Sequence, residues 1–334
     1  MKFKFHLTLA ALAAAAIFSS VLMAAAPVPA APPGAGAAAP GAGGAGRGAG
    51  RGAGRGGPPA PFDQPIANYT LNLTKHTQLV AKAKAAADAK GGPGSVDLYF
   101  EGDSITDFWE SNATHKANFD KNFGGWKPGD FGISGDTTQG VLYRLANGEL
   151  DGVNPKAIVL LIGTNNLGGG FGGAAAGDDS AMVTNITKGV EAVVKALHGK
   201  APEAKIVLMA ITTRNQNAGG GRGRRGAPGA ATTPATAPAT ATAPATAPNP
   251  AALTPQMPTI NKINANLEQF VKDNTDKTLT IKFLNINDKL ADKDGVLHAG
   301  MMQDGLHPTD QGYQIWADAL KPILTEWLGA PASK

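Results

Sequence analysis

Residues 157–166 read AIVLLIGTNN, an apolar run that ends at a glycine and three polar residues. The run does not alternate between apolar and polar residues, which is typical of a strand covered on both faces. Similar runs lie at 96–100, 205–211 and 279–284, and a shorter one at 130–133. The sequence therefore predicts a buried sheet of mainly five strands.

Four helical patterns alternate with these strands, at 137–147, 180–198, 259–273 and 309–327. In the second pattern the apolar residues recur at helical spacing and form one stripe. Alternating strands and helices predict an α/β fold, with a parallel sheet covered by helices on both sides in three layers, α/β/α. In such sheets, ligands bind beyond the carboxyl ends of the strands.

The composition limits the classes of protein to which the chain can belong. It has 334 residues and no cysteine, which excludes a disulfide framework, thiolate metal ligands and a cysteine nucleophile. Eight of the 30 Lys and Arg residues lie in residues 1–61 and in the low-complexity tract at about 215–258, and neither stretch contains Asp or Glu. The rest of the chain therefore carries 22 positive against 26 negative residues. Nucleic acid is not expected as a partner, because phosphate binding needs concentrated positive charge on the fold.

The first 26 residues have the pattern of a signal peptide. Lys2 and Lys4 precede an apolar run at 7–23, and small residues follow. The alternative is a retained membrane anchor, but an apolar run of about 17 residues is at the short limit for crossing a bilayer. We expect cleavage and export, to the periplasm or the extracellular medium, with no stable membrane span left afterwards.

Two tracts of low complexity flank or interrupt the foldable sequence. Residues 27–65 consist mainly of Gly, Ala, Pro and Arg, and a tract at about 215–258 is rich in Pro, Thr, Ala and Gly. Such sequences lack the apolar periodicity that a packed core requires. We interpret the first as a disordered linker and the second as an insertion in a surface loop of a domain at 66–330.

Four short motifs fall in loops at the predicted carboxyl edge of the sheet. GDS places Ser104 directly after the first strand, and GISGD places Gly135 after the second. GTNN places Asn165 after the third, and DGLHP places Asp304 and His307 before the last helix. These loops span about 200 residues, but parallel strands that end at one edge can bring them together.

Each motif suits one role in acyl transfer. Ser104 can attack a carbonyl carbon, His307 can accept its proton, and Asp304 can hold the imidazole in the required tautomer. The charge on the carbonyl oxygen needs fixed donors. The backbone N–H groups of Ser104 and Gly135 and the side-chain amide of Asn165 can provide them.

The order of the blocks GDS, GxSGD, GTNN and DxxHP resembles the SGNH or GDSL hydrolase superfamily, which is named for a Ser, Gly, Asn and His in four blocks. The stretch 133–166 resembles the branch that contains the catalytic subunits of platelet-activating-factor acetylhydrolase and bacterial carbohydrate or acyl esterases. The resemblance covers roughly residues 95–328. It implies a flavodoxin-like three-layer fold and ester hydrolysis with no metal and no cofactor, with Ser104, Gly135 and Asn165 as the oxyanion hole.

Several positions leave alternatives open. Glu101 stands where apolar residues are common in relatives, and either lies on a solvated rim or perturbs the site. Arg214, after the fourth strand, either contacts a polar substrate or is solvated. Trp109 and Trp316 either pack in the core or line an acyl or sugar cleft.

Rival assignments also exist for the base and for the function. His298 is the rival to His307 because it lies nearby in sequence. We expect an exported serine esterase for short acyl groups, above all acetyl, on carbohydrate or other polar substrates. The ester substrate is expected to be a small molecule or a polysaccharide. The alternatives are a lysophospholipase or lipase, an acyl transferase of the same fold, and a non-catalytic protein that binds the cell wall.

Overall fold

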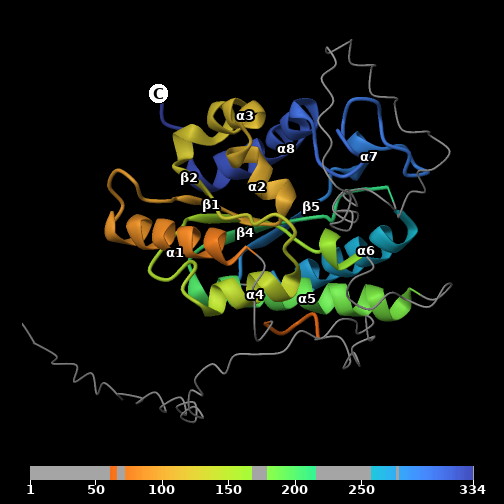
Figure 1. The fold of residues 1–334 in the computed structure, drawn as a ribbon, viewed down its shortest axis with the longest axis horizontal. Helices are drawn as coiled ribbons and strands as arrows, with labels where there is room; N and C mark the ends of the chain where they lie inside the picture. Colours follow the sequence, from red (N-terminus) through yellow and green to blue (C-terminus); the bar gives the residue numbers. More distant parts are fainter. Residues whose placement is uncertain (1–60, 66–71, 168–178, 216–256, 276–277, 334) are drawn as a thin grey trace, which may run out of the picture. The chain divides into compact units, whose positions relative to one another are not determined.

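A parallel sheet of five strands lies at the centre of the fold (Figure 1). Its strand order is β2-β1-β3-β4-β5, the order of flavodoxin-like doubly wound folds. The predicted α/β/α architecture with its five-stranded parallel sheet is confirmed. The strands are β1 (Leu98–Gly102), β2 (Pro128–Asp130), β3 (Ala157–Leu161), β4 (Lys205–Met209) and β5 (Ile281–Leu284).

The computed structural model describes residues 61–65, 72–167, 179–215, 257–275 and 278–333. The predicted signal peptide and nearly all of both low-complexity tracts lie outside these residues. Within them, no helix combines the length and the hydropathy that a bilayer span requires.

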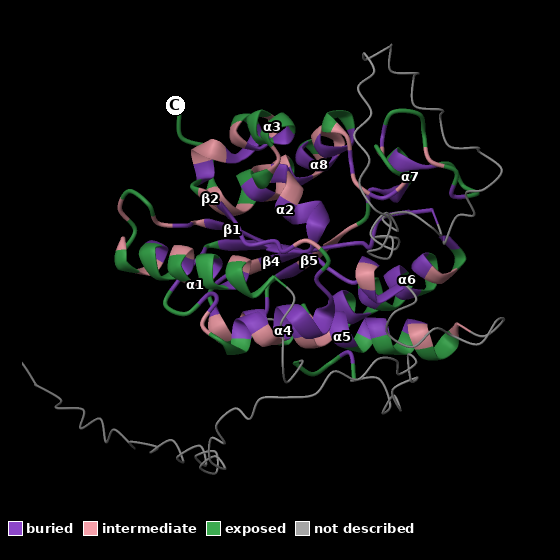
Figure 2. Ribbon diagram, viewed as in Figure 1, coloured by how far each residue is buried: buried purple, intermediate pink, exposed green. Residues whose placement is uncertain are grey.

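Helices cover both faces of the sheet, as Figure 1 shows. Their buried surfaces face the strands and their exposed surfaces face outward (Figure 2). One face carries α1 (Leu73–Asp88), α4 (Thr138–Ala146), α5 (Ser180–Lys200) and α6 (Met257–Asn274). The other carries α2 (Ser104–Ser111), α3 (Ala113–Phe123), the short α7 (Asn287–Leu290) and α8 (Asp310–Leu328).

Successive strand side chains pack into two separate apolar cores, one on each face. In β3, Ile158 belongs to the core beneath α4, α5 and α6, whereas Val159 belongs to the core beneath α2, α3 and α8. This division follows from the period of two along a strand. It also explains why the sequence of β3 is apolar at every position.

The second core contains a cluster of stacked aromatic rings. The rings of Trp109 and Trp316 stack with centroids 4.9 Å apart, and Tyr313 stacks on Trp109 at 4.8 Å. At most 1% of either tryptophan is exposed. The alternative in which Trp109 and Trp316 line a cleft is therefore wrong, and both pack in the core.

The described segment 61–65, just before the predicted domain boundary at residue 66, contacts the fold. Phe62, which we placed in the linker, is buried, and its carbonyl oxygen accepts a hydrogen bond from Thr138 Oγ at 2.8 Å. A Cβ on Gly189 of α5 would approach the same carbonyl to 2.7 Å, so a small residue there lets the segment lie close to the helix. Phe62 therefore belongs to the domain.

Candidate active site

The site lies between neighbouring strands whose following helices pack on opposite faces of the sheet. β1 and β3 pair in register as far as Gly102 and Leu161. The chain leaves β1 into α2 on one face, whereas after β3 it continues to α5 on the other. Doubly wound sheets bind ligands at the carboxyl edge beside such a reversal.

Ser104 is the first residue of α2 and is buried. Asp103 caps the helix, since its Oδ1 accepts a hydrogen bond from the backbone N–H of Ile105 at 3.0 Å. A Cβ on Gly102 would collide with the carbonyl oxygen of Leu161 and the hydroxyl of Thr106. The glycine of the GDS motif thus allows the close strand contact that positions the serine.

His307 joins Ser104 and Asp304 in one chain of hydrogen bonds. Ser104 Oγ lies 2.9 Å from His307 Nε2, and His307 Nδ1 lies 2.7 Å from Asp304 Oδ2. The three residues come from segments 203 positions apart in sequence. If Nδ1 carries the proton and donates to the carboxylate, Nε2 is left with a lone pair directed at the serine hydroxyl.

Asp304 is held as a carboxylate. Its Oδ1 accepts hydrogen bonds from the backbone N–H groups of His307 at 2.8 Å and Leu306 at 3.0 Å. Burial raises the pKa of Asp304, but the hydrogen bonds from the side chain and backbone of His307 outweigh it and lower the pKa to about 2. The group is therefore ionised at neutral pH, as an acceptor for imidazole N–H must be.

The loop that carries Asp304 and His307 is held by Asn215, in the segment that follows β4. The backbone N–H of Asn215 donates to the carbonyl of Gly305 at 3.0 Å. Gly305 has a φ of +80°, and a Cβ there would lie 2.7 Å from the side-chain nitrogen of Asn215. The glycine in DGLHP is thus required both by backbone conformation and by lack of space.

Gly135 and Asn165 lie on either side of Asp136. Gly135 precedes it in the chain and adopts a left-handed φ of +86°. Asn165 Nδ2 donates to the carbonyl oxygen of Asp136 at 2.7 Å, and the same amide nitrogen carries a second hydrogen. The second and third motifs therefore meet next to this peptide, at the exits of β2 and β3.

The neighbouring Asn166, which our sequence analysis did not single out, caps the helix that follows the glycine loop. Its Oδ1 accepts from the backbone N–H of Thr138 at 3.1 Å, and its Nδ2 donates to Gln139 at 2.9 Å. The two asparagines of GTNN thus have different partners. Asparagine at the start of a helix is a capping signal, but here it caps another helix, which local sequence does not show.

Phe108 is a second residue of the site that the sequence did not indicate. Its ring lies 4.9 Å from the imidazole of His307, measured between centroids. Phe108 follows Ser104 by four positions on α2, the spacing at which side chains share one helix face. That spacing is the signal that places it beside the nucleophile.

Arg214 and Glu101 are both buried, so the alternatives in which their charges are solvated are wrong. Arg214 is buried and donates to the carbonyl oxygen of Thr164 at 2.9 Å, directly before Asn165. Burial lowers its pKa, while the carboxylates of Asp103 and Asp304 raise it. Glu101 is also fully buried, with Oε1 2.6 Å from Arg144.

Asp103 adds a second buried carboxyl group next to the nucleophile. Burial raises its pKa to about 7, although the hydrogen bond from Ile105 N–H and the charge of His307 act in the opposite direction. Its Oδ1 is the helix cap described above. The local charge of the site thus changes close to neutral pH.

Comparison with known proteins identifies the family. Residues 100–315 match the GDSL-like lipase/acylhydrolase family, and the chain belongs to it. The alpha2 subunit of platelet-activating factor acetylhydrolase IB from rat is 26% identical over 199 residues, which are 60% of this chain and 65% of the relative. The human alpha1 subunit is 36% identical over 88 residues, 26% of this chain and 33% of that one.

A solved structure supports the fold independently. A Bacteroides fragilis protein described as an acylhydrolase superposes with a TM-score of 0.51 at 19% identity, covering 76% of this chain and 96% of that one. The predicted membership of the SGNH/GDSL superfamily is confirmed. The chain spans 65% of the length of the alpha2 relatives that it matches.

Proposed function

We propose that the protein is an exported esterase that removes short acyl groups, above all acetyl, from a carbohydrate or another polar substrate. The proposal rests on one observation, the hydrogen-bonded series Ser104–His307–Asp304 with separations of 2.9 and 2.7 Å. These separations are within the reach required of a nucleophile, its base and the group that orients the base.

The reaction runs in two halves. Ser104 Oγ attacks the carbonyl carbon while His307 Nε2 takes the hydroxyl proton, and the tetrahedral oxyanion receives N–H donors from Ser104, Gly135 and Asn165. When the C–O bond breaks, His307 returns the proton to the leaving alcohol. Water then attacks the acyl-serine by the same route, with His307 as base, and releases the acid.

Two features support a short acyl group. The relatives are acetylhydrolases by name. The ring of Phe108 lies 4.9 Å from the imidazole of His307, measured between centroids, and we expect it to limit the room for a long acyl chain. The polar substrate follows from the resemblance of residues 133–166 to the branch with carbohydrate esterases. Export follows from the signal-peptide pattern of residues 1–26.

Replacing the nucleophile is the direct test. Ser104→Ala should abolish hydrolysis of p-nitrophenyl acetate and covalent labelling by a fluorophosphonate probe, while circular dichroism and the melting temperature stay close to those of the unchanged protein. Ser111→Ala, on the exposed end of the same helix, is the matched control and should keep full activity. Undiminished turnover by Ser104→Ala would refute the mechanism.

The substrate class needs its own measurement. A series of p-nitrophenyl esters from acetate to palmitate should give the highest kcat/KM for acetate. A maximum at long chains would instead identify a lipase, and formation of an acylated sugar when a sugar acceptor is added would identify a transferase. If the unchanged protein neither turns over any ester nor labels, the non-catalytic wall-binding alternative is favoured.

A further inference from the structure

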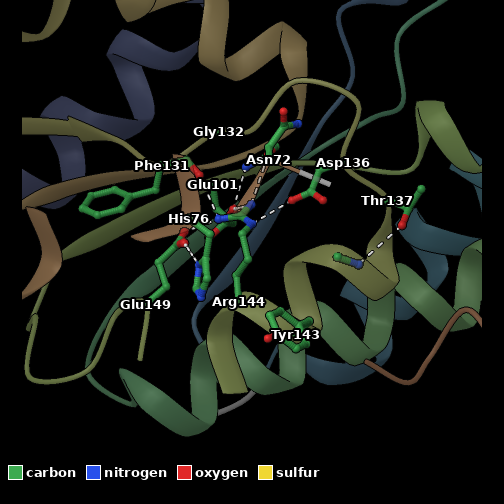
Figure 3. Close-up of polar contacts among 12 residues, drawn as sticks. Asn72, His76, Glu101, Phe131, Gly132, Asp136, Thr137, Tyr143, Arg144 and Glu149 are labelled. Atoms are coloured by element: carbon green, nitrogen blue, oxygen red, sulfur yellow. Dashed lines mark hydrogen bonds and ion pairs between the residues drawn. The ribbon is translucent and has the colours of Figure 1, made fainter. Parts of the chain in front are cut away.

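A fully buried arginine lies behind the loops that carry the proposed oxyanion donors. Arg144 projects from α4, and its guanidinium is surrounded by carboxylates, as Figure 3 shows. We call Glu101, Asp136, Arg144 and Glu149 the Arg144 cluster. Each of the three carboxylates contacts the guanidinium, and all four side chains have an exposed fraction of zero.

The guanidinium makes as many hydrogen bonds as it has N–H groups, which is five. Two acceptors lie at the end of β1, two on the loop after β2, and one after α4. They are Glu101 Oε1 at 2.6 Å, Gly102 O at 3.3 Å, Asp136 Oδ2 at 2.7 Å, Phe131 O at 3.0 Å and the close Glu149 Oε1.

Two of these segments adjoin the proposed catalytic groups directly. Gly102 lies two residues before Ser104, and its carbonyl also accepts from the N–H of Ile133. Asp136 follows Gly135, and its carbonyl accepts from the amide of Asn165 at 2.7 Å. One side chain thus connects the residues that adjoin all three proposed oxyanion donors.

The same loop is held from its other side by α2. Asp107 Oδ2 accepts hydrogen bonds from the backbone N–H of Ser134 at 3.2 Å and from its hydroxyl at 2.7 Å. Arg144 therefore fixes one end of the segment that contains Gly135, and Asp107 fixes the residue before the glycine. Apart from its chain neighbours, no atom lies within 4 Å of the position that a Cβ on Gly135 would occupy. The contacts of Ser134 and Asp136 therefore position its backbone.

The Arg144 cluster contains one arginine and three acidic residues. Burial raises the pKa of Glu101 well above its usual value, with the charge of Glu149 adding to this effect and the charge of Arg144 opposing it. Glu149 also lies 3.3 Å from His76 Nδ1. A buried network of this kind is weak support for stability, because desolvation offsets most of the attraction.

Geometry therefore explains the cluster better than stability does. We propose that Arg144 is a positioning residue that holds the Gly135 loop and the Ser104 segment at the separation that the oxyanion requires. The inference rests on the proposed function, since it assigns a role toward the same oxyanion. A lysine cannot replace it, because an ammonium is a point charge with three donors and lacks the planar fork.

Arg144→Lys is the test, measured with p-nitrophenyl acetate at a temperature where circular dichroism shows the variant folded. We expect kcat to fall about 100-fold with KM within about twofold of the unchanged protein, since small displacements of catalytic groups cost rates of that order. Leu267→Ala, at a fully buried position on α6, is the control. It should lower the melting temperature and leave kcat of the folded protein unchanged.

Each other outcome has a defined meaning. If Arg144→Lys keeps kcat within threefold, or if Leu267→Ala loses as much kcat, Arg144 serves stability alone and the inference is wrong. If Arg144→Lys does not fold, Asp136→Asn decides. It should lose about tenfold in kcat at constant KM, and failure of both variants to fold also assigns the cluster to stability.

The inference and the proposed function fail separately. Turnover by the unchanged protein, together with loss of turnover in Ser104→Ala, establishes the function whatever Arg144→Lys does. If the unchanged protein is inactive, the function is wrong and the positioning role falls with it.

Discussion

Asn165 differs from the other proposed oxyanion donors because its donor is a side chain that already has a partner. One amide hydrogen is engaged by the carbonyl of Asp136 at 2.7 Å, which fixes the orientation of the group. The second hydrogen is then available in a fixed direction without any cost of reorganisation when charge develops.

We predict that Asn165→Ala lowers kcat for p-nitrophenyl acetate by roughly 100- to 1000-fold, the usual loss for one oxyanion donor. Fluorophosphonate labelling of Ser104 should slow but still occur, since the nucleophile and base are intact. Asn166→Ala tests the neighbouring position, and we expect it to lower the melting temperature through the lost helix cap with a much smaller change in kcat. Equal losses of kcat in the two variants would contradict the assignment.

The sequence predicted the groups that we propose to act, together with Asp304 beside His307, but it did not predict Arg144. Ser104 and His307 stand in short motifs, so their types and order are visible. Arg144 stands at a buried position of a helix, three residues after Val141, and helical spacing does indicate that it faces inward. Its role was not predictable, because its partners come from β1 and from the loop after β2, and only the fold brings them together.

At the scale of elements, the loop before α8 depends on backbone conformation more than on side chains. Gly305 is held at φ +80° with its carbonyl bonded to Asn215 N–H. Gly329, at the end of α8, has the same φ but open space where a Cβ would be. Comparing substitutions at the two positions therefore distinguishes the cost of a positive φ from the cost of a steric clash.

We predict that Gly305→Ala is destabilised more than Gly329→Ala. Each change places alanine at a positive φ of 80°, which costs about 1 kcal/mol or more, but only the first drives a Cβ against Asn215. Urea unfolding should show the difference in stability. Only Gly305→Ala should lower kcat, because Asp304 directly precedes that glycine and His307 lies two residues after it. Equal destabilisation and equal activity would show that the Asn215 contact has no consequence.

The elements themselves were predictable to different degrees. β3 is an unbroken apolar run, and its predicted range 157–162 ends one residue beyond the observed strand. α1 was not predicted. Its buried line consists of His76, Leu79, Ala83 and Ala86, so there is little contrast in hydropathy between its faces. The helix is positioned by packing on the sheet, a tertiary effect that local pattern does not carry.

At the scale of the whole molecule, the site combines groups from loops that serve both faces of the sheet. Ser104 and His307 are in segments that lead into α2 and α8, whereas Gly135 and Asn165 precede α4 and α5 on the opposite face. A change in the spacing of the two layers would therefore move nucleophile and oxyanion donors relative to each other. The Arg144 cluster lies at this junction, which is why we expect its loss to affect rate before binding.

The pH dependence of stability is a property of the whole chain, and buried acids determine its sign here. Burial raises the pKa of Asp130 to about 8 and that of Asp103 to about 7. Above the usual aspartate pKa, the unfolded state has lost these protons while the folded state keeps them. The stabilisation is therefore complete below about pH 4, decreases as pH rises above that value, and is lost once pH has passed the folded pKa values of about 7 and about 8. Asp304, with a pKa of about 2, acts in the opposite sense, and its contribution is lost only as pH falls from about 4 through 2.

We accordingly predict that the free energy of unfolding falls between pH 5 and pH 9, and that Asp130→Asn reduces this slope. Asparagine keeps an oxygen to accept from the N–H of Gly132, now 2.7 Å from Asp130 Oδ1, but has no proton to lose. At pH 9 the variant should be more stable relative to the unchanged protein than at pH 5, by on the order of 2 kcal/mol.

Urea titrations at the two pH values measure this difference. Asp88→Asn, at an exposed position on α1, is the control for loss of one acidic group. A slope that Asp130→Asn leaves unchanged would mean that the Asp130 carboxyl is already ionised in the folded protein, and that Lys82, whose amine donates to the Asp130 carbonyl at 2.9 Å, neutralises it.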